Sequence, residues 1–187
     1  MSNPVAIIDY GLGNVFSILK ACERVGIRAQ LTATKEEILN SPAVILPGVG
    51  AFGDAMATLN NLDLVSVLKD FVHQGKPLMG VCLGLQLLME ESHEFGLHKG
   101  LGIIKGDVVK LNLEKKENRI LKVPEVCWNK VNKPAGKENA WDQTPLKDFS
   151  NGEYMYFVHS FYVRPKEKDV VLSHTQYGET EFCSSVK

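Results

Sequence analysis

Hydrophobic and polar positions alternate in blocks over the first 100 residues, and the blocks predict strands and helices in turn. Short apolar runs of roughly four to eight residues are typical of strands, whereas apolar residues at helical spacing are typical of a half-buried helix. Strands are predicted at 5–10, 28–32, 43–46 and 77–81, with helical stripes between them. This alternation favours an α/β fold of the flavodoxin-like kind, a parallel sheet with helices on both faces.

Local signals mark where the predicted helices begin and end. Asn14 is a predicted N-cap, and Gly26 follows the last turn of the same helix as a stop. Thr34-Lys35-Glu36-Glu37 has the form of a capping box that opens a short second helix. Gly75 closes a later helix. The apolar stripes of the first and last of these helices are Val15, Ile18, Leu19 and Cys22, and Leu64, Val65, Leu68, Phe71 and Val72.

The pattern changes after about residue 100. Short β-rich runs are separated by polar turns, which predicts antiparallel hairpins added to the α/β core in the C-terminal half. The polar segment 132–148 is a predicted surface loop, in which Trp141 is expected to be a local packing anchor. The predicted β-rich runs are 103–104, 108–111, 120–123, 126–131, 154–163, 170–173 and 182–186.

Composition narrows the class of protein. A chain of 187 residues with 44% hydrophobic content suits one globular domain, here 1–187. With 21 basic and 22 acidic residues, no overall field recruits nucleic acid or an anionic membrane. The apolar runs fall short of the roughly 20 residues that span a bilayer, and the start of the chain lacks the features of a signal peptide. Four scattered cysteines without a C-x-x-C pair fit reduced thiols, so a cytoplasmic protein is expected.

The strongest chemical signal is a cysteine between two glycines. In the stretch Gly80-Val81-Cys82-Leu83-Gly84, Cys82 lies where a predicted strand turns into a predicted helix. Small neighbours allow close approach of backbone and substrate, as in the G-x-S-x-G elbow of hydrolases. The helix N-terminus behind it is expected to lower the pKa of the thiol, which can fall to roughly 3.5–7.5. The alternative is an inert buried cysteine.

A second loop is a candidate oxyanion hole. Pro47-Gly48-Val49-Gly50-Ala51-Phe52 follows a predicted strand, and its backbone N–H groups could converge on an anion. A tetrahedral intermediate needs two donors about 3 Å from its oxygen, one from this loop and one from Leu83. An ordinary strand-to-helix turn is the alternative. Gly11 and Gly13 do not make a dinucleotide fingerprint, because the third glycine would fall at Phe16.

The chain resembles the class I glutamine amidotransferases from residue 5 to about residue 186. Within that family the resemblance is strongest to the glutaminase subunits of imidazole glycerol phosphate synthases. The segments that carry it are Ile7-Ile8-Asp9-Tyr10-Gly11-Leu12-Gly13-Asn14, Leu46-Pro47-Gly48-Val49-Gly50-Ala51-Phe52, Gly80 to Leu88, Val123-Pro124 with Trp128-Asn129, and Tyr156-Phe157-Val158-His159-Ser160-Phe161.

The resemblance implies a two-step reaction and a partner. Cys82 would form a thioester with glutamine and release ammonia to a (β/α)₈-barrel cyclase subunit, in a heterodimer that makes imidazole glycerol phosphate and AICAR for histidine biosynthesis. No metal or organic cofactor is implied. The resemblance assigns Gly48, Val49 and Gly50 to the oxyanion strand, Gln86 and the backbone at Ser160 and Phe161 to glutamine, and Trp128 and Tyr156 to the partner interface.

Two departures from the family leave alternatives open. The family's base is a histidine with a glutamate in a Gly-x-Gln-Phe-His-Pro-Glu segment, and no such segment occurs in residues 1–187. A C-terminally truncated sequence is the expectation, with a non-catalytic homologue, or His174 as the base, as alternatives. Glu125 and Cys127 replace the usual histidine and glycine. They would fit a paralogue serving another synthase, for example in surface-sugar biosynthesis. A different cysteine enzyme on a related sheet is the third possibility.

Overall fold

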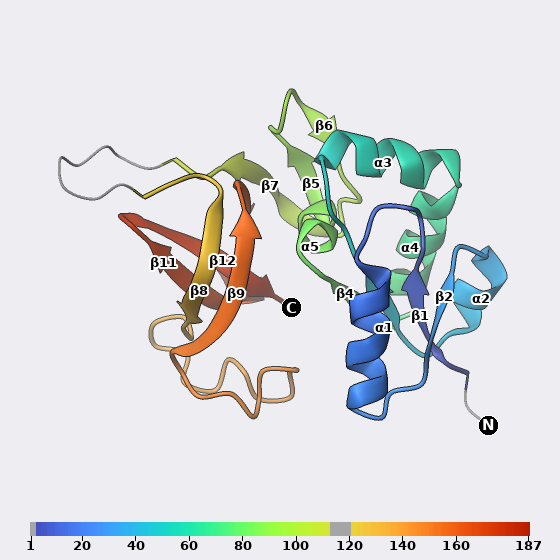
Figure 1. The fold of residues 1–187 in the computed structure, drawn as a ribbon, viewed down its shortest axis with the longest axis horizontal. Helices are drawn as coiled ribbons and strands as arrows, with labels where there is room; N and C mark the ends of the chain where they lie inside the picture. The colour runs from blue at the N-terminus through green and yellow to red at the C-terminus, as the bar shows by residue number, and fades with distance from the viewer. Residues whose placement is uncertain (1–2, 113–120) are drawn as a thin grey trace. The chain divides into compact units, whose positions relative to one another are not determined.

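A computed structural model describes residues 3–112 and 121–187 of the chain. Its contacts divide the chain after Ile104 into two compact units, of which the first holds the α/β elements and the second is built almost entirely from strands (Figure 1).

The first unit is built on a four-stranded parallel sheet. Its strands are β1 (Val5–Ile8), β2 (Ala29–Thr32), β3 (Val44–Leu46) and β4 (Leu78–Gly80), in the order β2-β1-β3-β4. Ile7 pairs with Leu31 on one side and with Ile45 on the other. All four predicted strands are thereby confirmed. The apolar run 77–81 does not form a buried strand, because β4 is the outer strand of this sheet and Met79 is 53% exposed.

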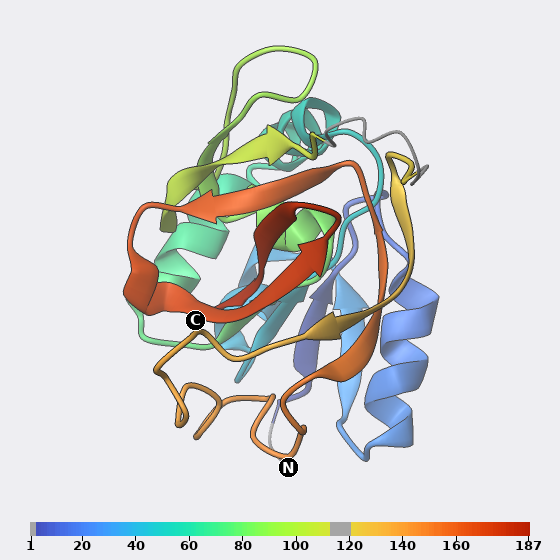
Figure 2. The same ribbon diagram turned by 90° about the vertical axis from the view of Figure 1, so that its left-hand side faces the viewer.

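Five helices accompany this sheet. The views in Figures 1 and 2 place α1 on one face and α4 on the other. The β1-to-β2 and β2-to-β3 connections run in opposite directions across the sheet, so right-handed crossovers put their helices on opposite faces. The helices are α1 (Val15–Arg24), α2 (Lys35–Asn40), α3 (Phe52–Asn61), α4 (Leu64–His73) and α5 (Leu83–Leu87).

Two of the predicted helix boundaries are confirmed and one capping device is wrong. The Asn14 side chain accepts a hydrogen bond from the Ser17 N–H at the start of α1. Gly26 follows the end of that helix with a φ of +77°, a conformation that glycine adopts readily. The predicted capping box fails, because Thr34 makes no side-chain cap and the Glu37 carboxylate instead accepts from the Thr32 hydroxyl.

The sequence patterns missed one helix and one hairpin. Helix α3 has a buried stripe at helical spacing, but the run after the glycine loop was not recognised as a helix. The apolar spacing after Cys82 would extend the helix to Glu90, but beyond α5 the chain forms a hairpin of β5 (Met89–Ser92) and β6 (His98–Lys99), so Glu90 lies on a strand. The buried stripe of α3 consists of Phe52, Ala55, Met56 and Leu59.

The core of the first unit lies where the central strands meet the helices. Its members are fully buried aliphatic and aromatic side chains, whose removal from water is worth roughly 1.5–3 kcal/mol each before entropy is counted. They include Ile7, Ile8, Ile38, Leu46, Phe52, Leu59, Leu64, Leu68 and Phe71.

The second unit is antiparallel, as predicted. Its strands are β7 (Ile104–Lys110), β8 (Glu125–Val131), β9 (Glu153–His159), β10 (Phe161–Pro165), β11 (Val171–Tyr177) and β12 (Thr180–Val186), with a 3₁₀ turn η1 (Lys168–Val170). β8 pairs with β9 in one hairpin, and β11 pairs with β12 in another (Figure 2). β12 also pairs with β10, and β10 in turn pairs with β7.

Two predicted runs differ from the structure. The run 154–163 is not one strand, because the chain bends at Ser160 and passes from the β8–β9 hairpin into the sheet that contains β10. In the predicted run 120–123, residue 120 lies outside the described residues, and 121–123 are not a strand.

Trp141 is a packing anchor for the turn-rich segment between β8 and β9, as the sequence predicts. The residue is 1% exposed and packs with Val131 and Leu172. Its indole N–H donates to the Leu172 carbonyl at 2.6 Å. The side chain therefore ties a segment without helices or strands to β8 and β11 by both packing and a hydrogen bond.

We expect Trp141→Phe to lower the free energy of unfolding by about 1–3 kcal/mol, because the Leu172 carbonyl is left without its donor and the smaller ring leaves a gap. Urea denaturation measures the change. Trp128→Phe is the matched control, since Trp128 is 67% exposed and its replacement should stay within about 0.5 kcal/mol of wild type. Equal effects of the two substitutions would contradict the anchoring role.

Candidate active site

Cys82 lies on a tight turn between β4 and α5, with φ and ψ of 55° and −114°. A positive φ is uncommon for a residue other than glycine, and such strained positions cluster at functional sites. The Cys82 carbonyl accepts from the N–H groups of Leu85 and Gln86, so the first turn of α5 begins at the cysteine itself. The residue is solvent-exposed. Cys82 is therefore not a fully buried core cysteine, although the surrounding protein partly desolvates its thiol.

The two flanking glycines are required by packing. A Cβ on Gly84 would come within 1.9 Å of the Leu46 carbonyl oxygen, and one on Gly80 within 2.6 Å of the backbone of Gly84. Cβ atoms do not approach other heavy atoms so closely, and any side chain here would force the backbone apart. The glycine spacing thus lets α5 begin directly against the end of β3.

The loop after β3 meets the elbow, as the sequence predicts. A Cβ on Gly48 would lie 2.7 Å from the Cβ of Leu83 and 2.9 Å from the amide nitrogen of Gly84. Gly50 has a φ of +97°, which allows the chain to turn before α3 begins. The structure therefore brings the 48–50 loop to the residue after Cys82, the place where a second oxyanion donor is needed.

The N–H of Val49 is engaged within the protein. It donates to the Leu12 carbonyl at 3.3 Å, a long hydrogen bond, while the Val49 side chain is 51% exposed. A donor that is already bonded cannot also stabilise an oxyanion. The Val49 N–H would therefore be available to an oxyanion only after this bond is released, at a cost of about 1 kcal/mol.

Tyr10 holds the loop after β3 through a hydrogen bond, a role that was not predicted from the sequence. Its buried hydroxyl donates to the Pro47 carbonyl at 2.9 Å. Burial raises the pKa of the Tyr10 phenol well above its usual range, and the nearby Cys82 thiolate charge raises it further. The phenol thus stays protonated as a hydrogen-bond donor. Its place in the Asp-Tyr-Gly-x-Gly-Asn segment was the only signal for it in the sequence.

Glu94 holds the other end of the loop and was also missed. The Phe52 N–H at the start of α3 donates to the Glu94 carboxylate at 2.6 Å, whereas the N-cap residue Ala51 has no side chain that could cap the helix. A negative charge is favourable at a helix N-terminus. Because Glu94 is 42 residues away in the sequence, no local pattern could have indicated this contact.

The expectation of a lowered thiol pKa is wrong. Desolvation by the surrounding protein raises the pKa of Cys82 above its ordinary value, and the Leu83 N–H, which hydrogen-bonds the sulfur, only partly opposes this shift. α5 has five residues, too short to supply the field of a long helix. The thiol is therefore mainly protonated at neutral pH until a base or a substrate acts on it.

The remaining residues singled out by sequence fall into two groups. Gln86 is half-buried on α5, four residues after Cys82. Ser160 and Phe161 lie at the bend between β9 and β10, and Trp128 and Tyr156 lie on β8 and β9.

His174, the alternative base, lies on β11 with its Nδ1 atom 3.9 Å from the Glu181 carboxylate. Its backbone forms a bridge with Asn132. In the second unit it is thus part of a strand pair, and its side chain faces a neighbouring acid.

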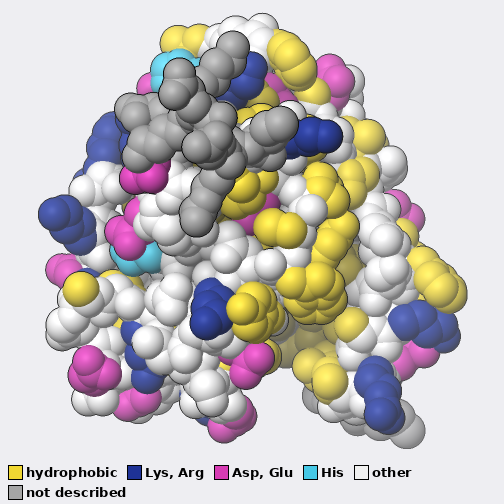
Figure 3. Space-filling model, turned by 60° about the vertical axis from the view of Figure 1, so that its left-hand side comes forward, with side chains coloured by type: hydrophobic (Ala, Val, Ile, Leu, Met, Phe, Trp, Pro, Cys, Tyr) yellow, Lys and Arg dark blue, Asp and Glu magenta, His cyan; other side chains and the backbone are white. Residues whose placement is uncertain are grey.

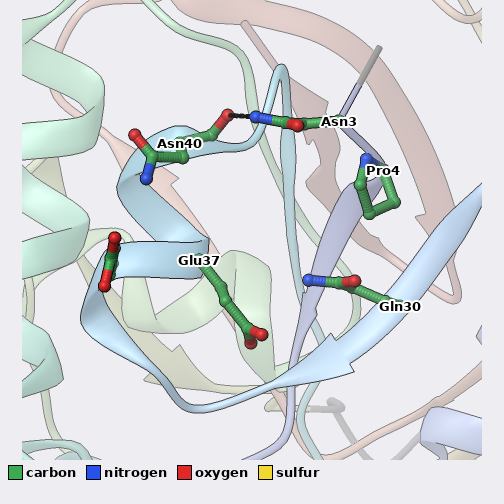
Figure 4. A pocket seen from close by; sticks show the side chains of 6 residues that line it. Asn3, Pro4, Gln30, Glu37 and Asn40 are labelled. Carbon is green, nitrogen blue, oxygen red and sulfur yellow. Dashed lines mark hydrogen bonds between the residues drawn. The ribbon is translucent and has the colours of Figure 1, made fainter. Parts of the chain in front are cut away.

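A small polar pocket lies in the first unit, away from the elbow. In Figure 4 the Asn3 side chain donates to the Asn40 carbonyl at 2.8 Å across this pocket. Its lining comes from residues just before or at the start of β1 and β2 and from α2, at the amino ends of the strands, whereas Cys82 follows the carboxyl end of β4. The lining residues are Asn3, Pro4, Gln30, Glu36, Glu37 and Asn40.

Comparison with known proteins points to one family. The family model described as glutamine amidotransferase class-I matches residues 6–187. Imidazole glycerol phosphate synthase subunit HisH of Rhodopirellula baltica is 42% identical over 184 residues, covering 98% of this chain and 83% of the relative. The HisH subunit of Aquifex aeolicus is 43% identical over 185 residues, covering 97% and 82%.

A solved glutamine amidotransferase has the same fold. It superposes with a TM-score of 0.67 at 18% identity and covers 97% of this chain and 88% of its own. Over residues 3–112 and 121–187, no helix is both long enough and apolar enough to cross a membrane.

The raised pKa predicts how Cys82 reacts with a small electrophile. The rate of alkylation by iodoacetamide should keep rising with pH beyond the ordinary cysteine value of about 8.5, because only the thiolate is nucleophilic. Mass spectrometry of the Cys82 peptide gives this rate, and a free cysteine-containing peptide serves as the control. A plateau below about pH 7.5 would mean that the helix terminus outweighs desolvation after all.

Proposed function

The chain belongs to the class I glutamine amidotransferase family, and from this membership we propose that it is the glutaminase subunit of an imidazole glycerol phosphate synthase. The family model spans both compact units, which we take as parts of one amidotransferase domain. Two relatives that carry the synthase subunit name are 42% and 43% identical over nearly the whole chain. The observation that carries the catalytic part is the strained, exposed Cys82 at the elbow.

The proposed reaction has two steps. The Cys82 thiolate attacks the side-chain amide carbon of glutamine, and a C–S bond forms while the carbonyl oxygen takes the negative charge. The Leu83 N–H, once released from its hydrogen bond to the Cys82 sulfur, and the 48–50 loop stabilise that charge. The C–N bond then breaks, the nitrogen takes up a proton and leaves as ammonia, and a γ-glutamyl thioester remains. Water hydrolyses the thioester to glutamate and restores the thiol.

Proton transfer needs a general base. The family resemblance assigns this role to a histidine and a glutamate in a Gly-x-Gln-Phe-His-Pro-Glu segment, which does not occur in residues 1–187. Since Cys82 carries a raised pKa, the thiol depends on such a base more than a cysteine with a lowered pKa would.

The resemblance also assigns Gln86 and the backbone at Ser160 and Phe161 to glutamine, and we retain this as part of the proposal. The released ammonia passes to a (β/α)₈-barrel cyclase subunit, which uses it to make imidazole glycerol phosphate and AICAR. We expect a heterodimer in the cytoplasm, where the four free cysteines would stay reduced.

The outer face of the β8–β9 hairpin is the proposed partner surface. Trp128 pairs with Tyr156 across the hairpin, with their rings 5.7 Å apart in an edge-to-face arrangement. Exposed aromatic side chains are typical of interface centres, and Figure 3 shows hydrophobic side chains gathered in one band on this side of the molecule. The exposed apolar residues of the hairpin are Val126, Trp128, Tyr154, Tyr156 and Val158, each more than half exposed.

We expect Cys82→Ala, in complex with the cyclase subunit, to lower glutamine-dependent turnover by several orders of magnitude, up to about 10⁶-fold, while ammonia-dependent turnover is unchanged. Formation of imidazole glycerol phosphate is measured with glutamine and then with an ammonium salt. Cys22→Ala, which removes a buried thiol from α1, is the control and should leave both rates intact.

The outcomes of this experiment separate the alternatives. Glutamine turnover by the Cys82→Ala complex would refute the proposed nucleophile. A wild-type complex that uses ammonia but not glutamine would identify the non-catalytic subunit. Binding to a cyclase from another pathway only would identify the paralogue that Glu125 and Cys127 suggested.

For the partner surface, we expect Trp128→Ala and Tyr156→Ala each to weaken binding of the cyclase subunit by about 2 kcal/mol, roughly 30-fold in Kd. Isothermal titration calorimetry measures both. Phe149→Ala is the control, because Phe149 is 44% exposed but lies in the turns between the two strands. If all three variants bind like wild type, the hairpin face is not the interface.

A further inference from the structure

The inner face of the β8–β9 hairpin carries a fully buried carboxylate. Side chains alternate along β8, so Val126, Trp128 and Lys130 point outward while Glu125 lies on the opposite face. Glu125 is 0% exposed. Burial of a carboxylate is unfavourable in free energy unless the group is paired and hydrogen-bonded, so the partners of Glu125 indicate its role.

The partner of Glu125 is His159, directly opposite on β9. The two residues are paired in register, and Nε2 of His159 lies 3.1 Å from Oε2 of Glu125. Among the described residues, neither of these two buried atoms has a hydrogen-bond partner elsewhere. The second carboxylate oxygen of Glu125 accepts from the Asn129 side chain at 2.9 Å, which fixes the carboxylate in place.

The tautomer of His159 follows from its other nitrogen. Nδ1 lies 3.0 Å from the Phe161 carbonyl, which can only accept, so Nδ1 must carry a proton and donate it there. If Nε2 carried none, its lone pair would face a carboxylate oxygen in a buried site. One proton shared between Nε2 and Oε2 removes this repulsion and lets one atom donate to the other.

The hydrogen bond to Phe161 spans the bend where the chain changes sheets. β9 ends at His159 and β10 begins at Phe161, with Ser160 between them. The Ser160 carbonyl accepts from the Leu111 N–H at 2.8 Å, so the bend is also tied to the chain after β7. The imidazole packs edge-on against the Phe182 ring, 4.9 Å between centroids, which leaves it little freedom to turn.

We propose that Glu125 and His159 form a positioning pair that sets the backbone of Ser160 and Phe161 for glutamine. The carboxylate orients the imidazole, and the imidazole holds the Phe161 carbonyl so that the bend has one conformation. This inference rests on the proposed function, because that function assigns the Ser160–Phe161 backbone to the substrate.

The first measurement tests the bend itself. Glu125→Gln keeps the size of the side chain but removes the charge, and we expect faster amide hydrogen exchange in peptides that contain residues 159–163. His159→Gln should give the same change, and the double variant no more than either single one, because the two residues act as a unit. Val131→Ala is the control for stability, since Val131 is buried at the far end of β8. It should leave the bend unchanged.

The second measurement tests whether the pair affects binding of a glutamine-like substrate next to Cys82. Cys82 of the complete protein, bound to its cyclase subunit, is labelled with a chloroketone analogue of glutamine, with chloroacetone and with iodoacetamide. In the Glu125→Gln and His159→Gln variants, the rate with the glutamine analogue should fall about tenfold, as for one misplaced substrate hydrogen bond. The rates with the two small reagents should not change.

Each outcome decides one point. Unchanged exchange at 159–163 overturns the pair as a positioning device, and so does a changed bend with wild-type labelling by the glutamine analogue. Equal loss with all three reagents also overturns it, because the effect would then lie at Cys82. If the wild-type protein is labelled no faster by the glutamine analogue than by chloroacetone, the proposed glutamine site is overturned. The hydrogen-exchange data would then still test whether the pair holds the bend in one conformation.

Discussion

The close approach of α5 to the end of β3 is the constraint on which the candidate active site depends. Gly84 lies so near the Leu46 carbonyl that a single Cβ would come within 1.9 Å of the oxygen. This approach fixes the start of α5 against the neighbouring strand, and it brings Leu83 against Gly48. The strained backbone of Cys82 follows, because the chain must leave β4 and enter the helix within two residues, Val81 and Cys82. The candidate nucleophile and the loop that would stabilise its intermediate therefore share one packing contact.

The loop beside the cysteine takes its shape from distant segments of the first unit. A phenol, a backbone carbonyl and a carboxylate each bind a different residue of it, so its conformation reflects contacts that the loop sequence alone does not contain. One of these contacts engages an N–H group that the reaction would need. The site is thus assembled but holds one donor in a competing bond of 3.3 Å. The three contacts are Tyr10 with Pro47, Leu12 with Val49, and Glu94 with Phe52.

Sequence patterns anticipated what depends on local spacing. The strands of the parallel sheet, the Asn14 cap, the glycine elbow and the antiparallel second unit all follow from periodicity or from backbone freedom. Helix α3 was not predicted, because its glycine and asparagines are poor helix formers beside its apolar stripe. The break at Ser160 was not predicted either, because the residues on both sides of it are typical of strands. The Glu94 contact and the pKa of Cys82 could not be predicted, since one joins residues 42 apart and the other depends on burial.

The β8–β9 hairpin separates two kinds of side chain by alternation alone. On its outer face, aromatic residues are exposed in register, as a surface that binds a partner requires. On its inner face, Glu125 and His159 bury polar atoms that have no other partners among the residues described. An apolar pair of similar volume would avoid the cost of desolvating the carboxylate, so stability does not account for these residues. The polar pair instead orients the bend. A hydrogen bond to the Phe161 carbonyl is directional and holds the bend at one angle, which packing alone does not do. The two faces of one hairpin would then serve the partner on one side and the substrate segment on the other.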